Sequence, residues 1–229
     1  MFYARVNLSK IKRSSSSLLN QRIGLNVILA IDETGAIGYQ NRLPWQHTPL
    51  KKDLSFFKHM TTYHPNSAVI MGSNTWNSLN HRPLKHRTNV VISRNHQTTL
   101  SFPSIHNYIQ HIQNKTVLHS IDPELNDKPP SLHWIIGGKQ IYEHIFKEHY
   151  YSIESIFLTK VHSTYNADTY FSLDNISTNF QLVSTHALKD NVPLTFYYYY
   201  NNLFLYRRPN RHILNAAWNE FINQNKDCP

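Results

Sequence analysis

The chain has 229 residues, 40% of them hydrophobic and 13% aromatic, so it can bury a sizeable core in one domain. No apolar run approaches the ~20 residues that a membrane-spanning helix requires. The formal net charge of +9 lies mostly at the two ends, because residues 1–24 hold five basic residues and no acid and residues 207–229 carry a net +2. Residues 25–206 carry the remaining net charge of +2, which indicates no basic surface of the kind that binds nucleic acid.

The first 24 residues are rich in Arg, Lys and Ser. This composition is typical of a mitochondrial transit peptide, and it fits an unstructured extension equally well. The single cysteine, Cys228, excludes an intrachain disulfide and favours a reducing compartment. We therefore expect a cytoplasmic protein, with the mitochondrion as the alternative that a transit peptide would give.

From Leu25 on, strands and helices alternate. The run LNVILAI (25–31) is typical of a buried strand, and the DETG after it of a turn. Helical spacing follows in PLKKDLSFFKHMT (49–61), with a proline near its start, where proline is tolerated. SAVIMG (67–72) predicts a second buried strand, NTWNSL (74–79) a short helix and TNVVISR (88–94) a third strand.

The second half continues the alternation and then changes. SIHNYIQHIQ (104–113) has helical spacing, and the three prolines of 119–131 indicate a loop. LHWIIGG (132–138) predicts a strand and KQIYEHIFKEHY (139–150) a helix. Three further strands are expected at the end of the domain, within 155–161, 180–188 and 194–208, the last two pairing antiparallel.

This order describes a single α/β domain. We expect a mostly parallel sheet with an antiparallel C-terminal edge and helices on both faces. The domain should span 25–208, after an N-terminal extension (1–24) and before a tail (209–229). The tail contains an amphipathic turn or two in ILNAAWNEFI, which either docks on the body or stays loose.

Two strands end in glycine directly before a helix, at Gly72 and at the pair Gly137 and Gly138. Ligands of open α/β sheets bind beyond the carboxyl ends of the strands, where helix N-termini favour phosphate. Each glycine alone could merely permit a tight turn. Together with Ser93 and Arg94 at the end of a third strand, they favour a dinucleotide, although no GxGxxG occurs.

Asp53 begins a helix whose next bulky residues are Leu54, Phe56 and Phe57. A carboxylate at the rim of an apolar pocket is costly unless a partner pairs with it. A helix cap or an exposed charge is the plainer interpretation. No metal site is expected, because His144 and His149 lie five residues apart and no cysteine is available beside them.

Five motifs occur in an order that resembles dihydrofolate reductase: ILAIDETGAIGYQNRLPW, Asp-Leu-x-x-Phe, VIMGSNTW, RPLKHRTNVVISR and IIGGKQIY. LTKV and ADTYF also occur where the family pattern places them, so the resemblance covers roughly 25–206. It implies an eight-stranded α/β fold that binds NADPH and reduces dihydrofolate to tetrahydrofolate. It also implies an enzyme whose substrate is a small molecule, dihydrofolate. We expect this enzyme to be a monomer that binds neither nucleic acid nor membrane.

The resemblance assigns a role to each motif residue on the substrate side. Asp53 matches the active-site carboxylate, which grips the ring N–H and exocyclic amine of a pterin through two hydrogen bonds. Phe57 matches the aromatic wall, Arg87 the arginine that binds the substrate's glutamate, and Thr159 a threonine that supports the pterin amine through water. Leu43 and Trp45 fall in the mobile loop over the site. The remaining substrate-binding positions are Ile28, Leu54, Leu79, Leu84 and Ile136.

On the cofactor side, the resemblance implies that Ala30, Ile37 and Gly38 border the nicotinamide and its ribose. Ser93 and Arg94 would meet the adenosine 2′-phosphate, and Gly137 and Gly138 match a pair joined by a cis peptide. The other cofactor-binding positions are Gly72, Ser73, Asn74, Thr75, Lys139, Gln140, Ile141 and Tyr142.

The chain departs from the family pattern at a few places. Position 73 is Ser where the family usually has Lys or Arg, which leaves Arg94 as the chief contact that would select NADPH over NADH. The spacing from Trp45 to Asp53 is also longer than expected, and its His47 is expected in solvent.

Two other functions compete with this one. One is the related reductase of riboflavin synthesis, which Asp53, its aromatic neighbours and Arg87 argue against. The other is an inactive homologue that binds nucleic acid or protein through its basic ends.

Overall fold

The computed structural model describes residues 23–95, 100–121, 129–172, 174, 176, 179–204 and 210–226. Residues 1–22 of the expected N-terminal extension, most of the proline-containing loop and Cys228 lie outside these residues. The chain divides into two compact units: Gly24–Ile105 with Pro130–Pro229, and Met1–Ile23 with His106–Pro129. In the described part of the chain, no helix is both long and apolar enough to cross a membrane.

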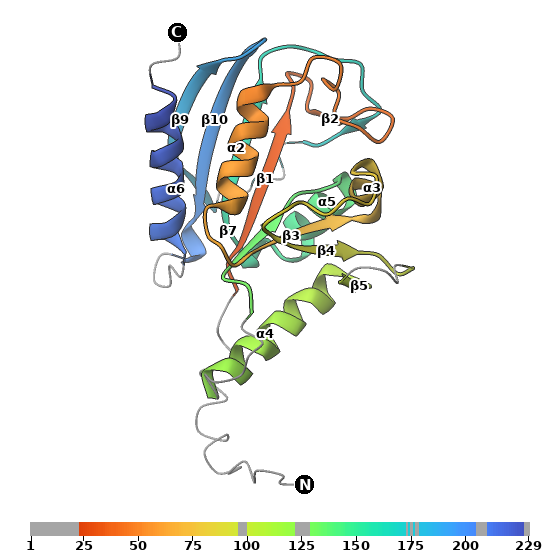
Figure 1. Ribbon diagram of the computed structural model, residues 1–229, viewed down its shortest axis with the longest axis vertical. Coiled ribbons are helices and arrows are strands. Elements are labelled where there is room, and N and C mark those ends of the chain that lie inside the picture. Colours follow the sequence, from red (N-terminus) through yellow and green to blue (C-terminus); the bar gives the residue numbers. More distant parts are fainter. Residues whose placement is uncertain are drawn as a thin grey trace, which may run out of the picture. The chain divides into compact units, whose positions relative to one another are not determined.

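The larger unit is built around an eight-stranded sheet (Figure 1). The sheet order is β5-β4-β3-β6-β1-β7-β10-β9, and a small second sheet pairs β2 with β8. The strands are β1 (Leu25–Ile31), β2 (Ala36–Gly38), β3 (Ser67–Gly72), β4 (Thr88–Ile92), β5 (Ser101–Phe102), β6 (Leu132–Ile135), β7 (Ile153–Val161), β8 (Thr169–Tyr170), β9 (Phe180–Lys189) and β10 (Pro193–Asn201).

Within the residues that the structure describes, five helices and two 3-10 turns accompany these strands. They are α2 (Lys51–Thr62), α3 (Ser73–Ser78), α4 (Ile105–Ile121), α5 (Lys139–Glu148) and α6 (Arg211–Gln224), with η1 (Tyr150–Ser152) and η3 (Asn202–Phe204). From His106 on, α4 belongs to the smaller unit.

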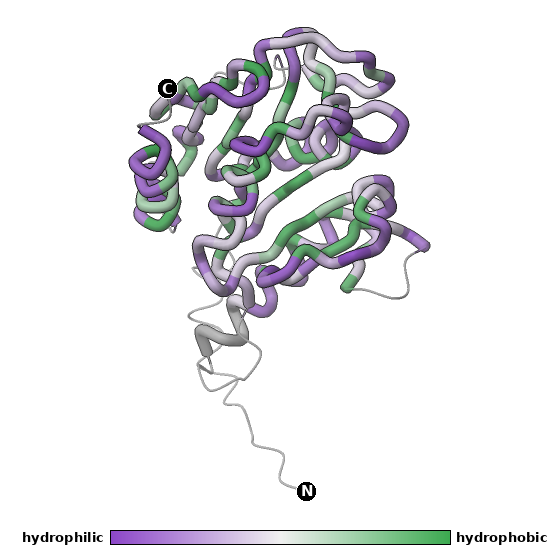
Figure 2. Tube along the Cα trace, turned by 45° about the horizontal axis from the view of Figure 1, so that its top comes forward, coloured by the Kyte–Doolittle hydropathy of each residue, from purple (hydrophilic) through white to green (hydrophobic). Residues whose placement is uncertain are grey.

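The predicted fold class is confirmed. The strands from β5 to β7 pair in parallel, and β10 pairs antiparallel with both β7 and β9. The central strands are buried almost throughout, which explains their continuous apolar sequences. Figure 2 shows the same segregation, with hydrophobic residues along the central strands and hydrophilic residues on the loops.

The strand β10 alternates instead, because only one of its faces is covered. Its buried residues Leu194, Phe196 and Tyr198 alternate with half-buried ones. On the buried side, Phe56 of α2 lies 4.6 Å from Phe196, and Trp218 of α6 lies 5.7 Å from Tyr198, ring centre to ring centre. Both helices therefore pack on this end of the sheet (Figure 1).

Several predicted boundaries were wrong. The helix expected at 104–113 continues to Ile121, because no proline or glycine interrupts it before Pro123. The strand expected at 132–138 ends at Ile135, and the chain turns at Gly137, whose φ is +110°. The last strand ends at Asn201, and 205–208 lie outside the described residues. The strands β2, β5 and β8 were missed, being only two or three residues long.

The tail forms more than a turn or two. α6 is a 14-residue helix whose residues Leu214, Ala217, Trp218 and Phe221 are buried. Of the two alternatives, docking on the body is the one observed.

Candidate active site

The parallel pairing gathers the predicted site residues at one edge of the sheet. Gly72 at the end of β3 pairs with Ile92 of β4, so Ser73 and Ser93 each directly follow a paired residue. Ala30 near the end of β1 pairs with Thr159 of β7. Since parallel strands end at the same edge, predicted substrate and cofactor residues become neighbours there.

Asp53 lies in the first turn of α2 and is only 8% exposed. The helix brings Asp53 against the sheet, where it forms a side-chain hydrogen bond with Thr159. Burial raises the pKa of Asp53 to about 6. The hydrogen bond with Thr159 opposes this rise, and the charge of Asp190 adds a smaller rise. The carboxyl group therefore exchanges its proton close to neutral pH.

Arg87, the arginine predicted to bind the substrate, is held by α2 and by its own loop. The Arg87 Nη1 donates to Thr61 Oγ1 at 2.7 Å, and its Nε donates to the Lys85 carbonyl at 3.0 Å. The guanidinium lies over the Phe57 ring, 5.8 Å from its centre. Asp53 and Phe57 thus lie on α2, and Arg87 contacts this helix from the loop before β4.

The five leucine and isoleucine positions differ in exposure, and Ile28 is buried. Leu79, Leu84 and Ile136 are partly buried and pack against the hydrophobic core, whereas Leu54 is 47% exposed. Phe56, next to Phe57, points the other way and is buried among Phe157, Phe196, Trp218 and Phe221. Phe56 is therefore a core residue and not part of a pocket wall.

Tyr142 joins α5 to β1. Its hydroxyl donates to the Ile28 carbonyl at 2.8 Å. A Cβ placed on Gly137 would lie 3.1–3.2 Å from the Tyr142 ring, and Gly137 also has a positive φ. Any other residue at 137 would be strained there, so glycine lets the backbone pass close to Tyr142.

The two glycine turns predicted from the sequence meet in the structure. The Gly72 N–H donates to the Gly137 carbonyl at 2.8 Å, and the peptide between Gly137 and Gly138 is cis, as predicted. A Cβ on Gly72 would lie 3.1 Å from Ile141, and one on Gly138 would lie 3.2 Å from Thr75 Oγ1. The glycines thus form a narrow backbone cradle between β3 and α5.

The polar residues beside the glycine cradle are accessible. Ser73 is partly exposed, and Asn74 and Arg94 are exposed. Lys139 and Gln140 are exposed at the start of α5, where Lys139 lies 3.7 Å from Glu143. Lys139 also lines a cavity of about 460 Å³ with Glu33 and Phe171, and neither Asp53 nor Gly72 lines that cavity.

The segment between β1 and α2 is fixed at several points. The Gly38 carbonyl accepts from the Asp168 N–H, and Asp168 Oδ2 accepts from the Gln40 N–H at 2.8 Å. Trp45 is buried and meets Tyr165 edge-on, whereas Leu43 is 42% exposed. Ile37 is half-buried, and His47 is exposed, as expected.

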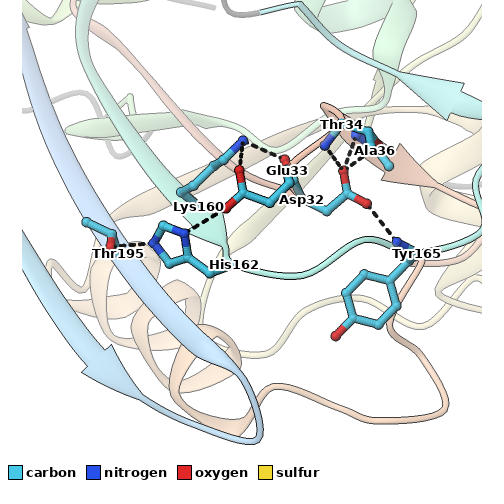
Figure 3. A network of polar contacts seen from close by, with 8 residues as sticks. All are labelled: Asp32, Glu33, Thr34, Ala36, Lys160, His162, Tyr165 and Thr195. Carbon is cyan, nitrogen blue, oxygen red and sulfur yellow. Dashed lines mark hydrogen bonds and ion pairs between the residues drawn. The ribbon is translucent and has the colours of Figure 1, made fainter.

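A polar network at the end of β1 was missed in the sequence (Figure 3). The buried Asp32 carboxylate accepts from Thr34, from the Ala36 N–H and from the Tyr165 N–H. Burial would raise the pKa of Asp32, but these hydrogen bonds outweigh it and lower the pKa. The DETG turn was recognisable, because Asp often bonds to the backbone two residues on, but its distant partner was not.

The neighbouring residue extends this network to β7 and β10. Glu33 bonds to His162 Nδ1 at 2.7 Å and lies 3.3 Å from Lys160 Nζ. His162 Nε2 lies 2.8 Å from Thr195 Oγ1 (Figure 3). The hydrogen bond with His162, followed by the one with Lys160, lowers the pKa of Glu33. In the described residues, no three His, Cys, Asp or Glu side chains are grouped to hold a metal.

The chain is similar to known proteins over most of its length. A family model described as dihydrofolate reductase matches residues 24–202. The dihydrofolate reductase of Schistosoma mansoni is 35% identical over 156 residues, covering 64% of this chain and 77% of that protein. A bifunctional dihydrofolate reductase-thymidylate synthase of Paramecium tetraurelia is 34% identical over 176 residues, 76% of this chain but only 33% of that protein.

A solved structure agrees with these sequence matches. Dihydrofolate reductase from Enterococcus faecalis, complexed with NADP(H) and RAB-propyl, superposes with a TM-score of 0.61 at 26% identity. The match covers 78% of this chain and 96% of the other. α6 lies beyond the residues that the family model matches. With its sheet order, its buried acid and its glycine cradle, this chain belongs to the dihydrofolate reductase family.

Proposed function

We propose that this protein reduces 7,8-dihydrofolate to 5,6,7,8-tetrahydrofolate with NADPH. The observation that carries the proposal is the position of Asp53, a buried acid in the first turn of α2 beside Thr159. A carboxylate so placed can accept two hydrogen bonds from the ring N–H and exocyclic amine of a pterin. Phe57, farther along the same helix, suits the benzoyl ring of the substrate, and Arg87, which precedes β4 and contacts α2, suits its glutamate carboxylate.

The glycine cradle fits a dinucleotide cofactor. A Cβ at Gly72, Gly137 or Gly138 would meet Ile141, Tyr142 or Thr75 of the protein itself, so glycine lets the two strand-to-helix turns pack this closely together. The starts of α3 and α5 are thereby brought together, where phosphate groups are favoured. Arg94, two residues beyond Ile92 of β4, offers an exposed cation for the 2′-phosphate. When bound, NADPH supplies the hydride for C6 of the pterin.

The protein's own contribution is orientation, exclusion of water and control of a proton. Asp53 holds the pterin in one orientation, and its pKa of about 6 lets it keep a proton available near neutral pH for delivery to N5 through water. The loop that contains Leu43 and Trp45 lies between β1 and α2, where closure would exclude bulk water. We propose that the enzyme acts as a monomer.

The lone cysteine supports a reducing compartment, and we propose the cytoplasm. The basic, acid-free composition of residues 1–24 keeps the mitochondrion as the alternative.

The activity is tested by following NADPH absorbance in the presence of dihydrofolate. The full chain should consume NADPH only when dihydrofolate is present, and a diaminopteridine that competes for Asp53 should stop the reaction. NADPH consumption that ignores the diaminopteridine would indicate another substrate. A folded chain that leaves NADPH unchanged would contradict the proposal.

A further inference from the structure

The first turn of α2 is capped by a distant part of the chain. The residue before the helix is Leu50, whose side chain cannot cap it, and no side-chain cap bond is formed there. Instead the Lys52 N–H donates to Asp190 Oδ2 at 2.6 Å. Asp190 lies in the turn between β9 and β10, 138 residues away in sequence. Helix N-termini need such acceptors, because their first N–H groups have no partner within the helix.

The same turn holds the segment that leads into α2. Asp190 Oδ1 accepts from the Asn191 N–H at 2.8 Å, which orients the carboxylate. The Asn191 side chain donates to the Pro49 carbonyl at 3.2 Å. The β9–β10 turn therefore contacts the chain on both sides of Leu50, at Pro49 before the helix and at Lys52 in its first turn. Leu50 itself is fully buried in the core.

Lys52 is also held from a third direction. Its ammonium donates to Asn225 Oδ1 at 2.8 Å, at the C-terminal end of α6. The residue next to Asp53 is thus fixed through its backbone by the β9–β10 turn and through its side chain by α6. Because Asp53 follows directly in the chain, its backbone has little freedom to shift toward or away from Thr159.

We propose that Asp190 is a positioning residue for the reductase reaction, which caps α2 and thereby holds Asp53 in its place against the sheet. The inference rests on the proposed function of Asp53. Asp190 is not among the residues expected to contact substrate or cofactor, and its hydrogen bonds are to Lys52 and Asn191, so it acts through the helix and through its charge. A misplacement of a catalytic group by as little as ~1 Å can cost up to about 100-fold in rate.

The charge of Asp190 adds a second, separable effect. Asp190 acts on Asp53 from the β9–β10 turn, and Thr159 of β7 bonds to it. Tyr142 of α5 also faces Asp53, whose charge adds to the rise that burial causes in the pKa of Tyr142. On α2 itself, the ammonium of Lys52 is turned to Asn225. After burial, the Asp190 charge is the other contribution that raises the pKa of Asp53. Removal of that charge should lower the pKa of Asp53.

The test compares Asp190→Ala and Asp190→Asn with the control Lys189→Ala, which removes an exposed charge from the same turn. The readout is the single-turnover rate of NADPH oxidation by the full chain with saturating dihydrofolate, measured as a function of pH. Asp190→Ala should lower the rate at neutral pH by roughly 10-fold and shift the apparent pKa downward. Asp190→Asn, which keeps one acceptor oxygen for Lys52, should recover much of the rate but show the same downward shift.

A merely structural role would lower the melting temperature of Asp190→Ala and leave the pH profile unmoved. An unmoved profile, or rates equal to those of Lys189→Ala, would overturn the proposal. Should Asp190→Ala fail to fold, the profile of Asp190→Asn decides alone. An inactive wild-type chain would instead overturn the function itself, so the two failures are distinguishable.

Discussion

Asp53 is a buried carboxyl group that must also recognise a ligand, and these two requirements have opposite effects on its charge. Burial disfavours its charged form, whereas ligand recognition needs an acceptor for two hydrogen bonds. A pKa of about 6 lets both protonation states coexist near neutral pH. The acid is therefore suited to bind a protonatable heterocycle and to control the proton that follows the hydride.

The substitution Asp53→Asn tests this role. It keeps the size and the hydrogen bond to Thr159 but removes the titratable group, so turnover at neutral pH should fall by roughly 10²–10⁴-fold. Activity should recover partly in acid, where the substrate itself arrives protonated. Steady-state rates of NADPH oxidation between pH 5 and 8 measure both effects. The control is Glu148→Gln on α5, an exposed acid. Rates near wild type at neutral pH would refute the role of Asp53.

Arg94 tests the choice of cofactor. Position 73 lacks the usual base, so Arg94 is the cation expected to meet the 2′-phosphate that NADPH has and NADH lacks. Arg94→Ala should raise KM for NADPH by about 10-fold or more, the loss expected of a charge-assisted contact, and change KM for NADH little. Lys147→Ala, an exposed cation on α5, is the matched control. Equal losses with both cofactors would contradict the assignment.

At this scale, the sequence predicted residues that act within a motif and missed those that act across the chain. Gly137 and Tyr142 lie five residues apart, and their motif predicted that they belong together. Asp190 and Lys52 lie 138 residues apart, and neither belongs to a recognisable motif. An acid in a turn is ordinary, and only the folded hairpin brings it to a helix that lacks a cap.

At the scale of elements, α6 completes the packing of the helix that carries the acid. The Phe56 ring lies 5.8 Å from Trp218 and 4.9 Å from Phe221. A ring nitrogen of His59 lies 2.9 Å from the Ala217 carbonyl and bonds to it. Amphipathic spacing in the tail indicated a helix, but the two alternatives stayed open because sequence spacing alone cannot show which surface a helix covers.

Truncation of a buried ring on α6 measures how much this packing stabilises the domain. Trp218 is 3% exposed, so Trp218→Ala should lower the free energy of unfolding by about 3–5 kcal/mol through lost burial and the cavity it leaves. Asn219→Ala, exposed on the same helix, should change it by less than about 0.5 kcal/mol. Urea unfolding measures both. Similar stability for the two variants would show that α6 does not stabilise the domain.

At the scale of the whole molecule, the buried acids determine how stability depends on pH. Burial raises the pKa of Glu154 to about 7, while the N–H groups of Asn210 oppose the rise. Asp53 is raised as well. A folded state with raised carboxyl pKa values binds protons that the unfolded chain has released, so stability falls as pH rises from about 4.5 to 7. Asp32 and Glu33 have lowered pKa values and act in the opposite sense, but only below pH ~4.5.

Glu154→Gln isolates the larger of these contributions. Glu154 joins the start of β7 to Asn210, the residue before α6, and a glutamine can keep both contacts if the Asn210 amide turns over. The variant should therefore lose less stability than wild type between about pH 5.5 and pH 8, and it should be the more stable protein at pH 8. Glu220→Gln, an exposed acid on α6, should keep the wild-type slope. Urea midpoints across this range measure the three slopes. Glu154 lies at the opposite end of β7 from Thr159, so the substitution should leave the pH profile of NADPH oxidation unchanged. Stability curves that run parallel for wild type and Glu154→Gln, together with a shifted profile, would contradict the prediction. They would show that the ionisation of Glu154 does not make the packing of α6 depend on pH.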